Sequence, residues 1–271
     1  MDDRPIGIFD SGLGGLTALK ALRRLLPGED LVFFADTGRM PYGPRPIPEL
    51  RRIAVQNMDF LASFGVKDIL SACGTTSSSA RRELASYPIP AFGVLRPALA
   101  AMAAVPGKKP LAVIATAASI KSGQFTEPLR ELCPGREIIA LACPDFVPMI
   151  EAGHIAPDDP VVLETVAREL APLRDTELDA LLLGCTHYGV IEAAIRAVLG
   201  DVPLLAAADC GAAALRDALL EGALTNSRTE GGSVRFYISS ESAPFEAFAS
   251  RYLEMGPVRA ERVPVMETMS L

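Results

Sequence analysis

Residues 68–84 read DILSACGTTSSSARREL, and this stretch indicates the fold. A short apolar run ends in glycine and small hydroxyl-bearing residues, and a helical pattern follows. A strand, a small-residue turn and an amphipathic helix form the repeating unit of parallel α/β proteins. Because open parallel sheets bind their ligands at the carboxyl ends of the strands, the thiol of Cys73 stands where a site is expected.

The same unit recurs along the chain. Four more apolar runs lead into a small-residue turn and then a helical pattern: IGIF (6–9), LVFFA (31–35), LAVIAT (111–116) and ALLLG (180–184). The recurrence predicts an α/β fold built on parallel strands. It also selects the polar residues that directly follow each strand as candidates for chemistry.

A weak internal repeat divides the chain in two. KDILSACGTT (67–76) resembles LDALLLGCTH (178–187), so each half has one strand-end cysteine. The repeat predicts two pseudo-symmetric parallel-sheet α/β lobes with the active site in the cleft between them. We expect residues 1–95 and 208–271 to form the N-terminal lobe, which carries Cys73. Residues 96–207 would form the second lobe, which carries Cys185.

Composition limits the partners. The net charge is −7 and the pI is about 5.0, which argues against direct binding to nucleic acid, because such binding depends on clustered Lys and Arg. The opening residues MDDRPIGIFDSGLGG lack the basic and apolar regions of a signal peptide. No apolar run is long enough to cross a bilayer. We therefore expect a cytoplasmic protein with no membrane association.

The five cysteines are widely spaced and form no C-x-x-C pair, so the sequence predicts reduced thiols and no metal site. Cysteine is among the most buried residue types, and packing is the expected role of Cys133, Cys143 and Cys210. Cys73 and Cys185 differ, because each precedes a turn that opens a helix. A helix N-terminus lowers a thiol pKa from about 8.5 towards neutrality.

Two thiols that face each other across a cleft suit one reaction in particular. One thiol removes a proton from a carbon atom and the other returns a proton to the opposite face, which is racemisation. Cys185 with His187 also leaves open acyl transfer by a Cys–His pair. Lysines are scarce in the strand-end turns, so a pyridoxal Schiff base is not expected. Hydroxyls and backbone N–H groups would have to hold a carboxylate there.

The chain resembles the glutamate racemase family over nearly its whole length. The resemblance rests on several motifs in the same order: FDSGLGGLT (9–17), DTGRMPYGPR (36–45), ACGTTSSSA (72–80), VIATAASIKSG (113–123), CPDFVPMIEAG (143–153) and LLLGCTHY (181–188). It implies a cofactor-independent interconversion of L- and D-glutamate that supplies D-glutamate for peptidoglycan. It also implies a homodimer, and some members of the family are reported to affect DNA gyrase.

The resemblance also implies roles for individual residues. Cys73 would take the α-proton from the D-isomer and Cys185 from the L-isomer, with Asp10, Glu151 and His187 assisting. The residues expected to bind substrate are Asp10, Ser11, Pro41, Tyr42, Gly43, Gly74, Thr75, Thr116, Thr186 and His187. Two of these also have a structural interpretation. Asp10 could equally be the N-cap of the helix that follows GLGG. The segment around Tyr42 indicates first a rigid proline-bounded turn, and second a hydroxyl that faces the substrate.

The chain departs from the family pattern at three turn positions. Gly74 stands where the family usually has Asn, Gly189 where it has Pro, and Ala115 where it has Gly. The change at Gly74 removes an amide that could hydrogen-bond the substrate, which leaves two further alternatives open. The protein could racemise another acidic amino acid such as aspartate, or it could be a non-catalytic paralogue that binds glutamate.

Overall fold

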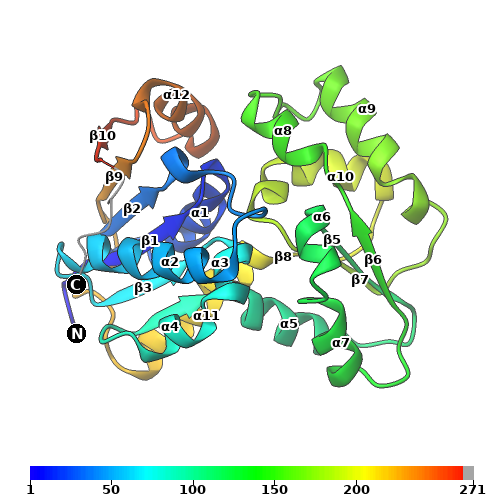
Figure 1. Cartoon of the computed structure of the whole chain (residues 1–271), viewed down its shortest axis with the longest axis horizontal. Coiled ribbons are helices and arrows are strands. Elements are labelled where there is room, and N and C mark those ends of the chain that lie inside the picture. Colours follow the sequence, from blue (N-terminus) through cyan, green and yellow to red (C-terminus); the bar gives the residue numbers. More distant parts are fainter. Residues whose placement is uncertain (265–271) are drawn as a thin grey trace.

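The computed structural model describes residues 1–264 and contains two parallel β-sheets, one in each lobe (Figure 1). The first sheet has the order β10-β9-β2-β1-β3-β4, with β1 Ile6–Asp10, β2 Leu31–Ala35, β3 Asp68–Ser71, β4 Ala91–Gly93, β9 Val234–Ile238 and β10 Ala260–Arg262. The second has the order β6-β5-β7-β8, with β5 Leu111–Ala115, β6 Ile138–Ala142, β7 Ala180–Leu183 and β8 Leu204–Ala206. Every strand pair is parallel, so the predicted two-lobed α/β fold is confirmed.

Helices alternate with the strands along the chain. The α-helices are α1 Leu16–Leu25, α2 Ile47–Ala62, α3 Gly74–Ser79, α4 Arg81–Ser86, α5 Leu95–Ala103, α6 Ala117–Lys121, α7 Thr126–Leu132, α8 Phe146–Glu151, α9 Pro160–Glu169, α10 Glu192–Leu199, α11 Ala207–Glu221 and α12 Ser242–Leu253. The 3₁₀ helices are η1 Leu13–Gly15, η2 Thr37–Arg39, η3 Ala171–Leu173 and η4 Thr186–Ile191. No helix among the described residues combines the length and apolar composition that crossing a membrane requires.

The central strands are apolar throughout because helices cover both faces of each sheet. All residues of β1, β2, β5 and β7 are buried. The covering helices contribute apolar residues at helical spacing, as Leu16, Leu19 and Leu22 of α1 do. The buried strands pack against the apolar faces of the covering helices, and this packing fixes the positions of the polar residues at the strand ends.

Two helices connect the lobes. Helix α5 leads from β4 of the first sheet to β5 of the second, and α11 follows β8 and packs against both α1 and α5 (Figure 1). Strand β9 then pairs with β2, so the chain returns to the first sheet as the sequence pattern predicts. The domain boundaries at residues 95/96 and 207/208 stay predictions.

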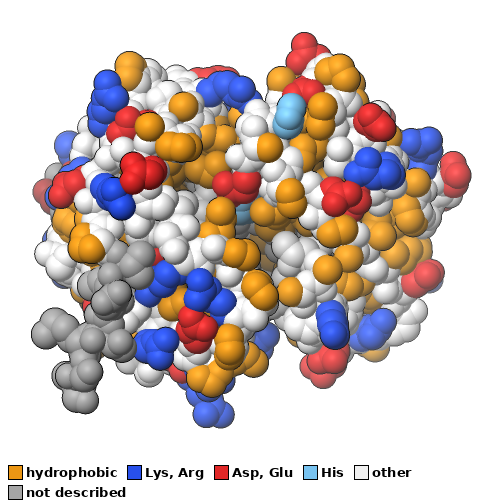
Figure 2. All heavy atoms as spheres, turned by 45° about the horizontal axis from the view of Figure 1, so that its top comes forward, with side chains coloured by type: hydrophobic (Ala, Val, Ile, Leu, Met, Phe, Trp, Pro, Cys, Tyr) orange, Lys and Arg blue, Asp and Glu red, His pale blue; other side chains and the backbone are white. Residues whose placement is uncertain are grey.

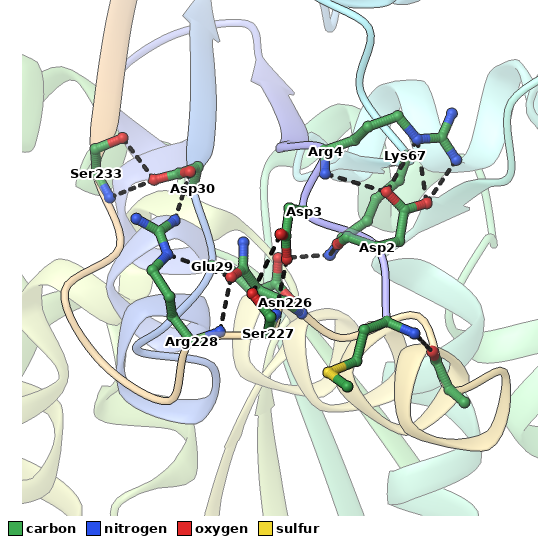
Figure 3. A network of polar contacts seen from close by, with 12 residues as sticks. Asp2, Asp3, Arg4, Glu29, Asp30, Lys67, Asn226, Ser227, Arg228 and Ser233 are labelled. Atoms are coloured by element: carbon green, nitrogen blue, oxygen red, sulfur yellow. Dashed lines mark hydrogen bonds and ion pairs between the residues drawn. The ribbon is translucent and has the colours of Figure 1, made fainter.

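A buried ion pair holds the loop between α11 and β9 against the first sheet, at the end of the sheet remote from Cys73 (Figure 3). Lys67 Nζ lies 2.6 Å from Glu29 Oε2, and both side chains are almost fully buried. Lys67 also donates to the carbonyl oxygen of Asp2, while Glu29 accepts from the backbone N–H of Asn226. The pair thus joins the N-terminus, the start of β2 and the loop after α11.

Removing one partner of this pair should destabilise the protein strongly. We expect Lys67→Met to lower the free energy of unfolding in urea by about 3–5 kcal/mol, because it leaves Glu29 buried without its counter-charge. The double variant with Glu29→Leu should recover part of that loss. Lys109→Met is the matched control, since Lys109 pairs with Glu177 on the surface. Equal effects of Lys67→Met and Lys109→Met would contradict this account.

Candidate active site

The two strand-end cysteines lie on segments that contact each other. Cys73 follows β3 and directly precedes α3, and Cys185 follows β7 and directly precedes η4. A Cβ atom added to Gly74 would lie 3.3 Å from the carbonyl oxygen of Gly184. The residue after one cysteine therefore lies beside the residue before the other, with room for no more than one added carbon atom between them, which brings the two halves of the internal repeat together.

The first thiol is buried and protonated. Cys73 is 5% exposed, and its Sγ donates to the Oγ of Ser11 at 3.7 Å. Burial raises the pKa of Cys73 to about 11, the charge of Asp10 adds to the increase, and contacts with Thr76 and Ser11 only partly offset it. The predicted lowering of this pKa is wrong, because α3 has only six residues and burial outweighs its N-terminus. Cys73 rests as a thiol that can donate a proton.

The second thiol has a histidine and a carboxylate beside it. Cys185 Sγ lies 3.8 Å from Nδ1 of His187, and Nε2 of the same ring lies 2.6 Å from Oε1 of Glu151. Burial alone would lower the pKa of His187, but the contacts with Cys185 and Glu151 raise it well above its ordinary value. His187 is therefore an imidazolium at neutral pH, and its positive charge can offset negative charge on the neighbouring sulfur.

Asp10, the last residue of β1, joins the two lobes. Its fully buried carboxylate accepts from the backbone N–H of Gly12 and, at 3.4 Å, from the Thr186 hydroxyl of the second lobe. Burial raises the pKa of Asp10 to about 6, while His187, Gly12 and Thr186 act in the opposite direction. The N-cap interpretation of Asp10 is wrong, because Gly15 occupies the N-cap of α1 and Gly12 that of η1. This carboxyl group can gain or lose a proton near neutral pH.

The glycines of the first turn allow this approach of the lobes. A Cβ atom on Gly14 would lie 2.4 Å from Oγ1 of Thr186 and 2.5 Å from Nδ1 of His187. Real Cβ atoms do not approach other atoms so closely, so residue 14 must lack a side chain for η1 and η4 to pack. Thr17 adds a polar contact across the same boundary, from its hydroxyl to the carbonyl oxygen of Thr186.

The other predicted binding residues divide into two sets. Gly43 and Thr75 line a cavity of about 420 Å³ together with Ala118 and Ser119 of the second lobe, so they lie where the lobes face each other. Thr116 instead caps α6, where its hydroxyl oxygen accepts from the N–H of Ser119. Pro41 is exposed. Figure 2 shows the hollow between the lobes, with acidic and histidine side chains visible in it.

Three site residues were missed at the sequence level. Asp36, Arg39 and Asn57 form a polar network behind Tyr42, next to Cys73. Asp36 carries the same signal as Asp10, an acidic residue directly after an apolar strand. Asn57 lies within α2 and carries no sequence signal. Among residues 1–264, no group of three or more His, Cys, Asp or Glu side chains is arranged to hold a metal ion.

The fold and the site define a two-lobed parallel α/β protein whose two strand-end cysteines lie on adjacent segments where the lobes join. Residues 18–215 match the Asp/Glu/hydantoin racemase family. The chain is also 40% identical to the glutamate racemase of Thermus thermophilus over 268 residues, covering 98% of this chain and 96% of that protein. This chain therefore belongs to the Asp/Glu/hydantoin racemase family. Racemases are isomerases, so the protein is an isomerase.

Solved structures agree with this assignment. A glutamate racemase isoform from Bacillus anthracis has a TM-score of 0.88 at 30% identity, covering 98% of this chain and 99% of its own. The glutamate racemase of Francisella tularensis, solved in complex with D-glutamate, has a TM-score of 0.84 at 32% identity and covers 97% and 98% of the two chains. The likeness thus extends over both lobes.

The protonation of His187 should depend on Glu151. We expect Glu151→Gln to lower the pKa of His187, because a neutral amide removes the charge that favours the imidazolium. Since the pKa of His187 is raised in the folded state, its contribution to stability is full below its ordinary value of 6.5 and is lost as the pH rises through the raised value. In the variant this loss should occur at lower pH.

An NMR titration of the imidazole carbons measures this shift directly. The chain has only two histidines, and His154 is the internal control because it contacts Asp159 instead. An unchanged titration of His187 in Glu151→Gln would show that Glu151 does not hold its proton.

Proposed function

We propose that this protein interconverts L- and D-glutamate, with one of Cys73 and Cys185 removing the α-proton and the other delivering its own proton to the opposite face of the carbon. The observation that carries the proposal is the contact of Gly74 with Gly184, which brings two strand-end thiol segments from opposite lobes against each other. Relatives named glutamate racemase, at 35–40% identity over 98% of this chain, support glutamate as the substrate.

The proton transfers follow from the different surroundings of the two sulfurs. With L-glutamate, Cys185 as thiolate takes the α-proton, and Cys73 as thiol delivers its own proton to the opposite face of the carbon. The reverse reaction uses each group in the opposite role. The imidazolium of His187 offsets the negative charge of the Cys185 thiolate, and Glu151 holds that imidazolium. The scheme needs no cofactor.

The buried setting supports the difficult step, which is removal of a weakly acidic α-proton. Fixed dipoles and charges act more strongly on a developing carbanion where water is excluded. Asp10, with its pKa raised to about 6, can accept from the substrate ammonium or exchange a proton with Cys73. Hydroxyls of Ser11 and Thr75 supply donors for the two carboxylates, while the Thr186 hydroxyl donates to Asp10.

Gly74 is the difference from the family pattern that could affect which substrate binds. The amide that the family usually has there is absent, and an unmet hydrogen bond in a buried site costs about 1–3 kcal/mol. The Francisella structure with D-glutamate supports glutamate as the ligand of this type of site. We propose glutamate over aspartate on this basis.

The wider setting follows from the family. We propose that the protein acts in the cytoplasm as a homodimer and supplies D-glutamate for peptidoglycan. No direct contact with nucleic acid is part of the proposal, because the chain is acidic. An effect on DNA gyrase is not required by any feature of the site.

One experiment tests the reaction and its alternatives. The protein is incubated with each glutamate enantiomer in deuterated water without cofactor, and optical rotation and α-carbon labelling are followed. We expect racemisation with deuterium at the α-carbon, and no full turnover in Cys73→Ser or Cys185→Ser, because each direction needs both thiols. Cys210→Ser on α11 is the control and should racemise normally.

Each alternative predicts a different result. Deuterium labelling at the α-carbon of aspartate but not of glutamate would indicate that the substrate is a different acidic amino acid. Binding of glutamate without labelling would indicate a non-catalytic paralogue. A covalent thioester that needs only Cys185 would indicate acyl transfer, and normal racemisation by Cys185→Ser would contradict the two-thiol scheme.

A further inference from the structure

A buried polar network surrounds Asp36, which directly follows β2. One carboxylate oxygen of Asp36 accepts from Nε of Arg39 at 2.6 Å and from the hydroxyl of Tyr42. The other oxygen accepts from the Ser239 hydroxyl at 2.9 Å, just after β9. Three donors from two segments, the turn after β2 and the end of β9, therefore hold one fully buried charge, which fixes its position.

The network uses the only hydrogen of the Tyr42 hydroxyl. That hydroxyl donates to Asp36 and accepts from Nδ2 of Asn57 at 3.1 Å. Arg39 completes the ring of contacts by donating to Oδ1 of Asn57 at 2.8 Å. A phenol has one donor, so Tyr42 cannot donate to a substrate while it bonds Asp36. The interpretation of Tyr42 as a hydroxyl that faces the substrate is wrong.

The aromatic ring of Tyr42 has a different position in the site. Tyr42 is 2% exposed and packs in one apolar cluster with Leu50, Ile53 and Cys73. The ring is thus part of the wall that keeps water from the Cys73 thiol. Asp36 and Asn57 hold its hydroxyl end, and the ring belongs to the same buried cluster as the reacting thiol.

We propose that Asp36 is a positioning residue for proton transfer at Cys73, acting through the ring of Tyr42. This inference rests on the proposed function. The network lies wholly within the first lobe, whereas the neighbours of Cys185 are His187 and Glu151 of the second. A loss at Asp36 should therefore slow the transfer at Cys73 and leave the transfer at Cys185 as it is.

Rates alone cannot show which transfer is slowed. The equilibrium constant of a racemisation is one, so kcat/KM must fall by the same factor for both enantiomers. Primary deuterium isotope effects separate the two steps, because each enantiomer gives its α-deuteron to a different thiol. When the Cys73 step becomes slower, the isotope effect rises for the isomer that Cys73 deprotonates and falls for the other.

The experiment measures these isotope effects on kcat/KM in Asp36→Asn, with glutamate deuterated at the α-carbon. We expect kcat/KM to fall by about ten- to a hundred-fold, as for a misplaced catalytic group. The isotope effect should rise for D-glutamate and fall for L-glutamate. Ser239→Ala removes one donor to Asp36 and should change both isotope effects in the same directions by less. It also keeps the test decisive if Asp36→Asn does not fold.

Asp59→Asn is the matched control. Asp59 accepts from the hydroxyl of Tyr87 at 2.7 Å on the surface of the same lobe, so the substitution removes a tyrosine–carboxylate contact away from the site. It should leave both isotope effects unchanged. Unchanged isotope effects in Asp36→Asn and Ser239→Ala, with only a lower free energy of unfolding, would overturn the proposal. Failure of the unsubstituted protein to exchange the α-proton would instead overturn the proposed function.

Discussion

The close approach of two backbone turns across the lobe boundary is the constraint on which the rest of the site depends. Gly14 lies against Thr186 and His187, and Gly74 lies against Gly184. A side chain at position 14 would push the two turns apart, whereas at position 74 a Cβ atom would need only a small adjustment. Asp10, Cys73 and His187 are buried beside these turns, and charges there interact more strongly than they would in solvent.

Burial then makes the two halves of the site chemically different, although the chain is built from a repeat. Burial raises the pKa of Cys73 to about 11, so this thiol keeps its proton at neutral pH, and it raises the pKa of Asp10 to about 6, so this carboxyl group exchanges its proton just below neutral pH. His187, beside Cys185, keeps its proton because Glu151 and the sulfur contact it. The surroundings of Cys73 therefore differ chemically from those of Cys185, although the two substrate enantiomers are mirror images.

The first lobe balances its buried charges at both ends of its sheet. Lys67 and Glu29 form a pair at the end remote from Cys73, where they fasten the returning chain. Asp36 and Arg39 form a second pair at the carboxyl ends of the strands, where Asn57 and Tyr42 join them. A buried charge without a partner is costly, so each pair holds segments distant in sequence in one arrangement. A buried ion pair thus stabilises the fold at one end of the sheet, and a second one holds the residues near the Cys73 thiol in place at the other.

The sequence by itself determined the α/β class, the parallel strands, the two lobes and the strand-end positions of Cys73 and Cys185, because these depend on local apolar periodicity and on turns. Only the tertiary structure decided the protonation of Cys73, which local reasoning about the following helix had in the wrong direction. It also decided that the Tyr42 hydroxyl bonds Asp36 and Asn57, a residue 15 positions away in α2. Burial and long-range partners set both properties, and neither is encoded in a short stretch of chain.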